Sequence, residues 1–175
     1  MAETTFDLEA LVALIPRLRR YARALAGDRA RADDLVQDTL ERAVIKRALW
    51  RSGTDLRAWV FTIMHNVFIN QTRKAARDAL PVDPAILAEI DTADGASAET
   101  YAQLNSIEIS LAQLSDEQRE VLLLVALEGM SYDEVAHTLG IPIGTVMSRL
   151  SRARARLAAL LEGEAPAART LKIVK

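Results

Sequence analysis

The sequence predicts an all-α protein of two small helical domains joined by an acidic flexible linker, the second domain having the outline of a helix-turn-helix. Three observations predict this. The 175-residue chain is rich in alanine, leucine and arginine but only 5% aromatic, which favours helices because unbranched side chains lose little freedom in them. Apolar residues recur at spacings of three and four along several stretches. Between those stretches, residues 78–108 hold seven acidic residues and no lysine or arginine.

The bulk composition restricts the class of protein. The chain contains no cysteine, which excludes disulfides and thiolate metal sites and suits a reducing compartment. No apolar run approaches the roughly eighteen residues of a membrane span. Acidic residues precede the first apolar stretch, the reverse of a secretory signal. We therefore expect a soluble, cytoplasmic protein without membrane insertion.

The N-terminal block, residues 1–77, is predicted to contain three amphipathic helices. The first, "LEALVALIPRLRRYARALAG", is expected to stop at Gly27. The second, "DDLVQDTLERAV", places on its apolar face Leu35, Val36, Thr39, Leu40, Ala43 and Val44. Its opposite face carries Asp34, Gln37, Asp38 and Glu41. The third, "DLRAWVFTIMHNVFINQTRKAAR", is polar and basic in its latter half and buries Leu56, Trp59, Val60, Ile63 and Val67.

The segment 78–105 is predicted to be a linker. Pro81, Pro84, Gly95 and the run "DTADGASAET" break helices and offer little apolar surface to bury. We therefore expect the two blocks to be loosely coupled in the free protein. Residues 164–175 are expected to form a disordered tail.

The C-terminal block, residues 106–163, carries clear helix boundaries. Ser115 can cap a helix that runs to about Glu128. The run "SYDE" from Ser131 is a capping box for the short helix "YDEVAHTL", which stops at Gly140. Pro142 suits the first turn of the next helix. Two helices joined by a tight turn containing glycine, the second one basic, predict a helix-turn-helix.

The last helix, "GTVMSRLSRARARL", contains four arginines and no acidic residue, although the whole chain has a formal charge of −2. A helical projection predicts a buried side of Val146, Leu150, Ala153 and Leu157. The opposite side holds only small residues, namely Gly144, Ser148, Ser151 and Ala155. Arg149, Arg152 and Arg156 lie on one flank of this ridge, and Arg154 lies on the other.

A small-residue ridge bordered by arginines lets a helix enter the major groove while guanidinium groups reach phosphates or guanine edges. A solvated surface helix would also explain the arginines, but such helices usually mix charges of both signs. The pattern therefore favours DNA binding. We assign Arg152, nearer the ridge, to a base contact and Arg149 to a phosphate contact.

The stretch "DEQREVLLLVALEGMSYDEVAHTLGIPIGTVMSRLSRARARL" resembles the C-terminal promoter-binding domain of extracytoplasmic-function (group IV, sigma-70 family) sigma factors. The stretches "RADDLVQDTLERA" and "DLRAWVFTIMHNVFINQTRKAAR" resemble the two main conserved regions of their N-terminal domain. The resemblance covers nearly the whole chain outside the linker and the tail. It implies an alternative sigma factor that binds core RNA polymerase and directs it to promoters through their minus-10 and minus-35 elements. It also implies regulation by an anti-sigma factor.

The resemblance assigns residues to three surfaces. Core polymerase would be bound by Asp34, Gln37, Asp38 and Glu41, which by themselves read as a solvated acidic face. The melted minus-10 element would be bound by Trp50, Asn66, Asn70, Gln71, Arg73 and Lys74. The duplex minus-35 element would be bound by Thr145, Ser148, Arg149, Ser151, Arg152, Arg154 and Arg156.

Two features of this assignment stay open. The stretch 46–54 resembles a loop that captures a flipped base, where Trp50 either stacks on the base or packs against Leu56. The chain also departs from the usual family residues, and the departures are consistent with a different promoter preference. They stand at Asn70, where aspartate is common, at Pro142–Ile143, where serine-glutamate is common, and at Met147, where lysine is common.

Three other functions fit the sequence less well. An enzyme is disfavoured because the chain has only two histidines, His65 and His137, and no glycine-rich phosphate loop or metal-spaced cluster. We therefore expect no catalysis, no cofactor and no metal. A stand-alone repressor or activator would leave the acidic helix without a role. A sigma-like mimic that only binds an anti-sigma factor would need no basic recognition helix.

Overall fold

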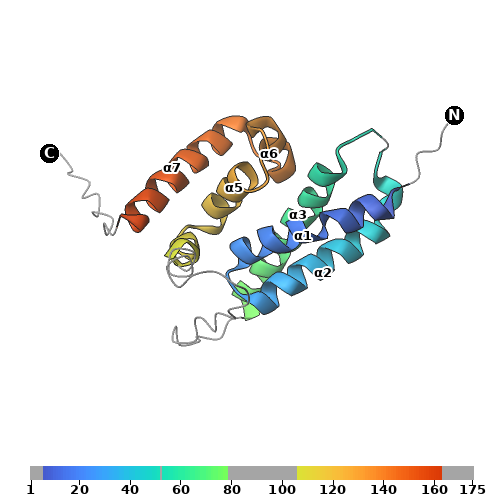
Figure 1. The fold of residues 1–175 in the computed structure, drawn as a ribbon, viewed down its shortest axis with the longest axis horizontal. Coiled ribbons are helices and arrows are strands. Elements are labelled where there is room, and N and C mark those ends of the chain that lie inside the picture. The colour runs from blue at the N-terminus through green and yellow to red at the C-terminus, as the bar shows by residue number, and fades with distance from the viewer. Residues whose placement is uncertain (1–5, 52, 79–105, 163–175) are drawn as a thin grey trace.

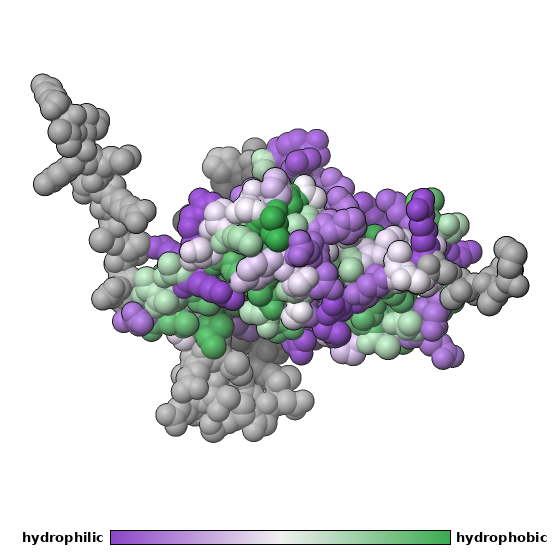
Figure 2. All heavy atoms as spheres, turned by 90° about the horizontal axis from the view of Figure 1, so that it is seen from above, coloured by the Kyte–Doolittle hydropathy of each residue, from purple (hydrophilic) through white to green (hydrophobic). Residues whose placement is uncertain are grey.

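The computed structural model describes residues 6–51, 53–78 and 106–162, and all the regular elements in these ranges are helical (Figure 1). The all-α prediction is thereby confirmed. Residues 79–105 of the predicted linker and the predicted tail lie outside the described residues. On the face seen in Figure 2, hydrophobic and hydrophilic residues are interspersed.

The N-terminal block consists of α1 (Leu8–Ala26), α2 (Arg29–Ile45), the short 3-10 helix η1 (Arg47–Leu49) and α3 (Leu56–Asp78). The Asp7 carboxylate caps α1 by accepting from two backbone N–H groups. Gly27 ends α1, as predicted, with a φ of 71° that a residue with a side chain rarely adopts. The block closes around a fully buried set that includes Leu18, Leu25, Leu35, Met64 and the edge-to-face pair of Tyr21 and Phe61.

The C-terminal block begins with a helical segment at residues 106–112 and continues through α5 (Asp116–Ala126), α6 (Tyr132–Leu139) and α7 (Ile143–Leu161). The predicted capping box of α6 is confirmed in both directions between Ser131 and Glu134. Gly140 ends α6 with a φ of 63°. Pro142 stands directly before α7 rather than in its first turn. The α6–turn–α7 pair packs on α5 and confirms the predicted helix-turn-helix.

The two blocks pack against each other, α1 on α5 and α3 on α6. Polar contacts with Glu128 help to hold this interface together. Arg57 Nη1 donates to the carbonyl oxygen of Glu128 at 2.9 Å, and Arg17 Nε donates to the Glu128 carboxylate at 3.0 Å. The Glu128 side chain is fully buried. We expected loosely coupled blocks, and the described arrangement differs from that expectation. Linker composition, on which the expectation rested, carries no information about contacts between the helices on either side.

Candidate nucleic-acid and polymerase interfaces

Helix α7 has the two faces that its sequence predicts. Val146, Leu150 and Ala153 are buried, and Leu157 is half-buried. The opposite ridge of Gly144, Ser148, Ser151 and Ala155 is exposed throughout. A Cβ placed on Gly144 would meet nothing within 4 Å. The ridge is therefore open to an incoming surface along its length.

The arginines beside this ridge are in different environments. Arg152 is exposed. Its side chain lies along the helix, because Nε donates a hydrogen bond to the Ser148 carbonyl oxygen at 3.1 Å. Arg154 is also exposed, whereas Arg156 and Thr145 are half-buried. The Arg149 side chain is only 20% exposed and pairs with the Glu117 carboxylate at 2.9 Å. A phosphate contact by Arg149 would therefore have to compete with Glu117.

The polar face of α2 is open except at one position. Asp34, Gln37 and Glu41 are exposed. Asp38 is half-buried, and its Oδ2 accepts a hydrogen bond from Gln71 Nε2 on α3 at 2.9 Å. One residue expected at the polymerase surface thus contacts one residue expected at the minus-10 surface. The two surfaces adjoin each other.

The remaining residues expected at the minus-10 element lie on α3 and on the loop before it. Asn66, Asn70, Arg73 and Lys74 are exposed, and their spacing of three and four residues puts them on one side of the helix. Trp50 is half-buried and packs edge-on against Phe6, with ring centroids 5.9 Å apart. Of the two alternatives for Trp50, the arrangement found is packing within the protein, with Phe6 as an aromatic partner.

Arg119 is a buried residue that the sequence interpretation missed. Its guanidinium donates to the carbonyl oxygens of Leu25, Leu111 and Leu114 at 2.6, 2.8 and 2.9 Å. It therefore satisfies carbonyl groups at the end of α1 and in the turn before α5. Burial lowers the pKa of Arg119 from its ordinary value. An arginine beside the apolar run "EVLLLV" is the sequence signal that could have identified it.

A second buried charge lies between α3 and α5. The Glu120 carboxylate is 4% exposed and lies 2.6 Å from His65 Nδ1. Burial raises the pKa of Glu120, and the hydrogen bond from His65 partly offsets that rise. At α6, by contrast, hydrogen bonds from Ser131 lower the pKa of the half-buried Glu134 carboxyl.

The described residues offer no group of three or more His, Cys, Asp or Glu side chains placed to hold a metal ion. The helices in these same ranges are each too short or too polar to cross a membrane.

Comparisons with known proteins match both halves of the chain. Residues 11–65 match the family described as the Sigma2 domain of PhyR, and residues 105–157 match Sigma-70, region 4. The chain is 38% identical to the ECF RNA polymerase sigma factor EcfG of Rhodopseudomonas palustris, over 86% of this chain and 82% of that protein. It is 39% identical to the ECF RNA polymerase sigma factor SigL of Mycobacterium tuberculosis, over 76% of each.

Solved structures show the same likeness. The sigma factor RpoE in complex with the anti-sigma factor NepR, from Bartonella quintana, aligns with a TM-score of 0.72 and 37% identity, covering 88% of this chain and 95% of that chain. CnrH in complex with the cytosolic domain of CnrY aligns with a TM-score of 0.65 and 27% identity, covering 90% and 88%.

Proposed function

The chain belongs to the ECF RNA polymerase sigma factor family, and from that premise we propose that it binds core RNA polymerase and directs it to promoters. The observation that carries this proposal is the exposed small-residue ridge of α7, with the exposed arginines Arg152 and Arg154 on its two sides. Such a helix suits the major groove of a minus-35 duplex. The chain would act in the cytoplasm as a non-catalytic initiation factor, because the polymerase itself synthesises the RNA.

The N-terminal block supplies the other two surfaces of the proposal. The exposed Asp34, Gln37 and Glu41 of α2 would bind core polymerase. The exposed polar side of α3 would bind the minus-10 element as single-stranded DNA, where Arg73 and Lys74 contribute positive charge. Because Asp38 holds Gln71, polymerase docking on α2 and DNA binding on α3 would occur on one continuous surface.

We further propose that an anti-sigma factor regulates the chain. RpoE of Bartonella quintana was solved in complex with the anti-sigma factor NepR, and CnrH was solved in complex with the cytosolic domain of CnrY. These two chains are 37% and 27% identical to this one along most of its length. A partner of the same class is therefore the expected inhibitor.

The packed arrangement of the two blocks bears on this activity. Minus-10 and minus-35 elements lie about 25 base pairs apart, or about 85 Å along a duplex at about 3.4 Å per base pair. Helices α3 and α7 belong to blocks in direct contact, and α3 itself, with 23 residues, is about 35 Å long. Both elements cannot be read at once in this arrangement. We infer that it is a resting state that opens on the polymerase.

A sigma-like mimic is the second candidate, and one observation favours it. Residues 11–65 match the Sigma2 domain of PhyR, and PhyR of Bartonella quintana is described as an anti-anti-sigma factor in its complex with NepR. That chain is only 18% identical to this one, so the likeness is one of fold. A mimic has no use for exposed arginines beside an open ridge, and these favour the initiation factor.

Run-off transcription tests the proposal. Purified core RNA polymerase is mixed with the chain and a library of promoter templates, and the 5′ ends of the transcripts are mapped. We expect initiation at discrete sites that share one minus-35 and one minus-10 sequence, and loss of that initiation with the double variant Arg152→Ala/Arg154→Ala. A mimic would neither bind core polymerase nor start transcription. It would instead restore the activity of another sigma factor inhibited by an anti-sigma factor.

A further inference from the structure

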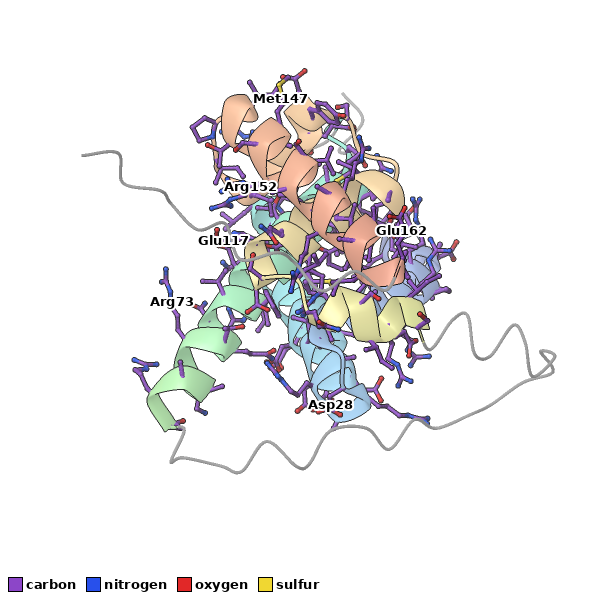
Figure 3. All side chains as sticks on the ribbon, turned by 90° about the vertical axis from the view of Figure 1, so that its left-hand side faces the viewer. Asp28, Arg73, Glu117, Met147, Arg152 and Glu162 are labelled. Atoms are coloured by element: carbon purple, nitrogen blue, oxygen red, sulfur yellow. The ribbon has the colours of Figure 1, made fainter. Side chains whose placement is uncertain are left out.

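The first turns of α7 carry apolar surface that the proposed function leaves unexplained. Ile143 is 38% exposed and Met147 is 49% exposed. They stand four residues apart and are therefore neighbours on the helix surface. Figure 3 shows Met147 at the end of the molecule, pointing away from the other helices. Core packing does not account for these two side chains, because Val146 and Leu150 already fill the buried side of the same turns.

The position of Met147 relative to the small-residue ridge indicates what it contacts. At about 100° per residue, Met147 borders the ridge of Gly144, Ser148 and Ser151 on one side, and Arg152 borders it on the other. The same helix has no acidic residue from Gly144 to Leu157. Any surface that reaches Met147 therefore also meets the positive charge of Arg152 and Arg154. This charge favours a polyanion over an apolar protein surface.

We propose that Met147, with Ile143 beside it, is a specificity-determining residue that contacts the C5-methyl group of thymine in the minus-35 duplex. This inference rests on the proposed function. The thymine methyl is the apolar feature that the bases present in the major groove, and side chains from the first turns of a recognition helix contact base edges. The two borders of the ridge would then read different bases, Arg152 a guanine edge and Met147 a thymine.

The test uses the holoenzyme assembled from core polymerase and the full chain. Its preferred minus-35 sequence is selected from duplexes randomised across that element. Each selected thymine is then replaced by deoxyuridine, which removes only the methyl group. At the contacted position we expect binding to weaken about three- to fivefold, the value of roughly one buried methyl group. Met147→Ala should bind the thymine duplex more weakly by a similar factor and should no longer distinguish thymine from uracil.

Two further variants make the result specific. Met147→Leu keeps an apolar side chain at the same place and should retain sensitivity to the methyl group. Leu161→Ala is the matched control, because Leu161 is 46% exposed at the other end of α7, and it should behave as the parent. Thermal unfolding of Met147→Ala should match the parent, since the side chain is exposed.

The outcomes separate this inference from the proposed function. A holoenzyme that selects a minus-35 sequence but ignores every thymine-to-uracil replacement overturns the role of Met147 and leaves the proposed function standing. The same holds if the selected sequence contains no thymine, or if Met147→Ala keeps the full sensitivity to the methyl group. A chain that forms no holoenzyme, or a holoenzyme that selects no sequence, overturns the proposed function itself.

Discussion

Leu150 and Arg152 stand two positions apart on α7 and differ in what they contact. Leu150 is 2% exposed, so Leu150→Ala should lower the free energy of unfolding by about 2–5 kcal/mol. Arg152 is exposed, so Arg152→Ala should change that free energy by less than about 0.5 kcal/mol and weaken duplex binding instead. Urea unfolding measures the first effect, and binding to promoter and scrambled duplexes across a salt series measures the second. Parent-like DNA binding by Arg152→Ala would remove this residue from the reading surface.

Glu120 makes stability depend on pH in a direction that can be worked out. The groups around its carboxylate are His65, Asp116, Arg149 and Tyr21, and burial raises its pKa above the ordinary 4.5. The native state therefore keeps this proton to a higher pH than the unfolded state does. As the pH rises above about 4.5, the parent should lose free energy of unfolding relative to Glu120→Gln, which cannot titrate. Urea titrations of both proteins at a series of pH values measure the difference. If the free energies of unfolding of the two proteins change in parallel with pH, the raised pKa of Glu120 is contradicted.

At the scale of single elements, most helix boundaries could be predicted because their causes are local. The capping box of Ser131 and Glu134 and the stop at Gly140 each involve residues within one turn of a helix end. The two faces of α7 follow from the helical period alone. Pairings between helices could not be predicted in this way. Glu117 precedes Arg149 by 32 residues, and Gln71 follows Asp38 by 33. The first contact depends on how α5 packs against α7, and the second depends on how α2 packs against α3.

The face of α2 carries a prediction about polymerase binding. Asp34 and Glu41 are exposed and belong to the proposed docking surface. Asp34→Lys/Glu41→Lys should weaken binding to core polymerase by at least tenfold. The reason is that two negative charges of the proposed docking surface become positive and then repel the part of the polymerase that the acidic residues would attract. Helical circular dichroism should stay unchanged. Asp38 is left intact because it holds Gln71, and Asp33→Lys, exposed just outside the predicted set, is the matched control. Full polymerase affinity in the double variant would refute the docking assignment.

At the scale of the whole molecule, the contact between the two blocks is the feature that sequence interpretation missed. His65 and Glu120 are 55 residues apart, and Arg57 and Glu128 are 71 apart, so each pair joins groups on opposite sides of the acidic segment. From the sequence alone, Glu128 is recognisable only as a residue close to the C-terminal end of α5. Its burial beneath Arg17, Arg20 and Arg57 depends on the docking of α1 and α3. Local sequence patterns carry no information about how helices so far apart in the sequence pack against each other.

The same contact provides the final prediction. In the packed arrangement, Arg17 and Arg20 both pair with the Glu128 carboxylate, which is fully buried. Arg17→Ala/Arg20→Ala would leave that buried charge largely uncompensated, which is strongly unfavourable, whereas separation of the blocks returns the carboxylate to water. Each block keeps its own helices, and Glu134 still caps α6 through Ser131. The double variant should therefore open while remaining helical.

Small-angle X-ray scattering of the free chain measures the opening, and we expect a larger radius of gyration for Arg17→Ala/Arg20→Ala than for the parent. Arg47→Ala is the matched control, because Arg47 is exposed and donates to the Val44 carbonyl oxygen within the N-terminal block. If opening is required on the polymerase, the double variant should also associate with core polymerase faster than the parent. An unchanged radius of gyration would mean that Glu128 does not hold the blocks together. Opening without faster association would mean that the packed arrangement does not limit polymerase binding.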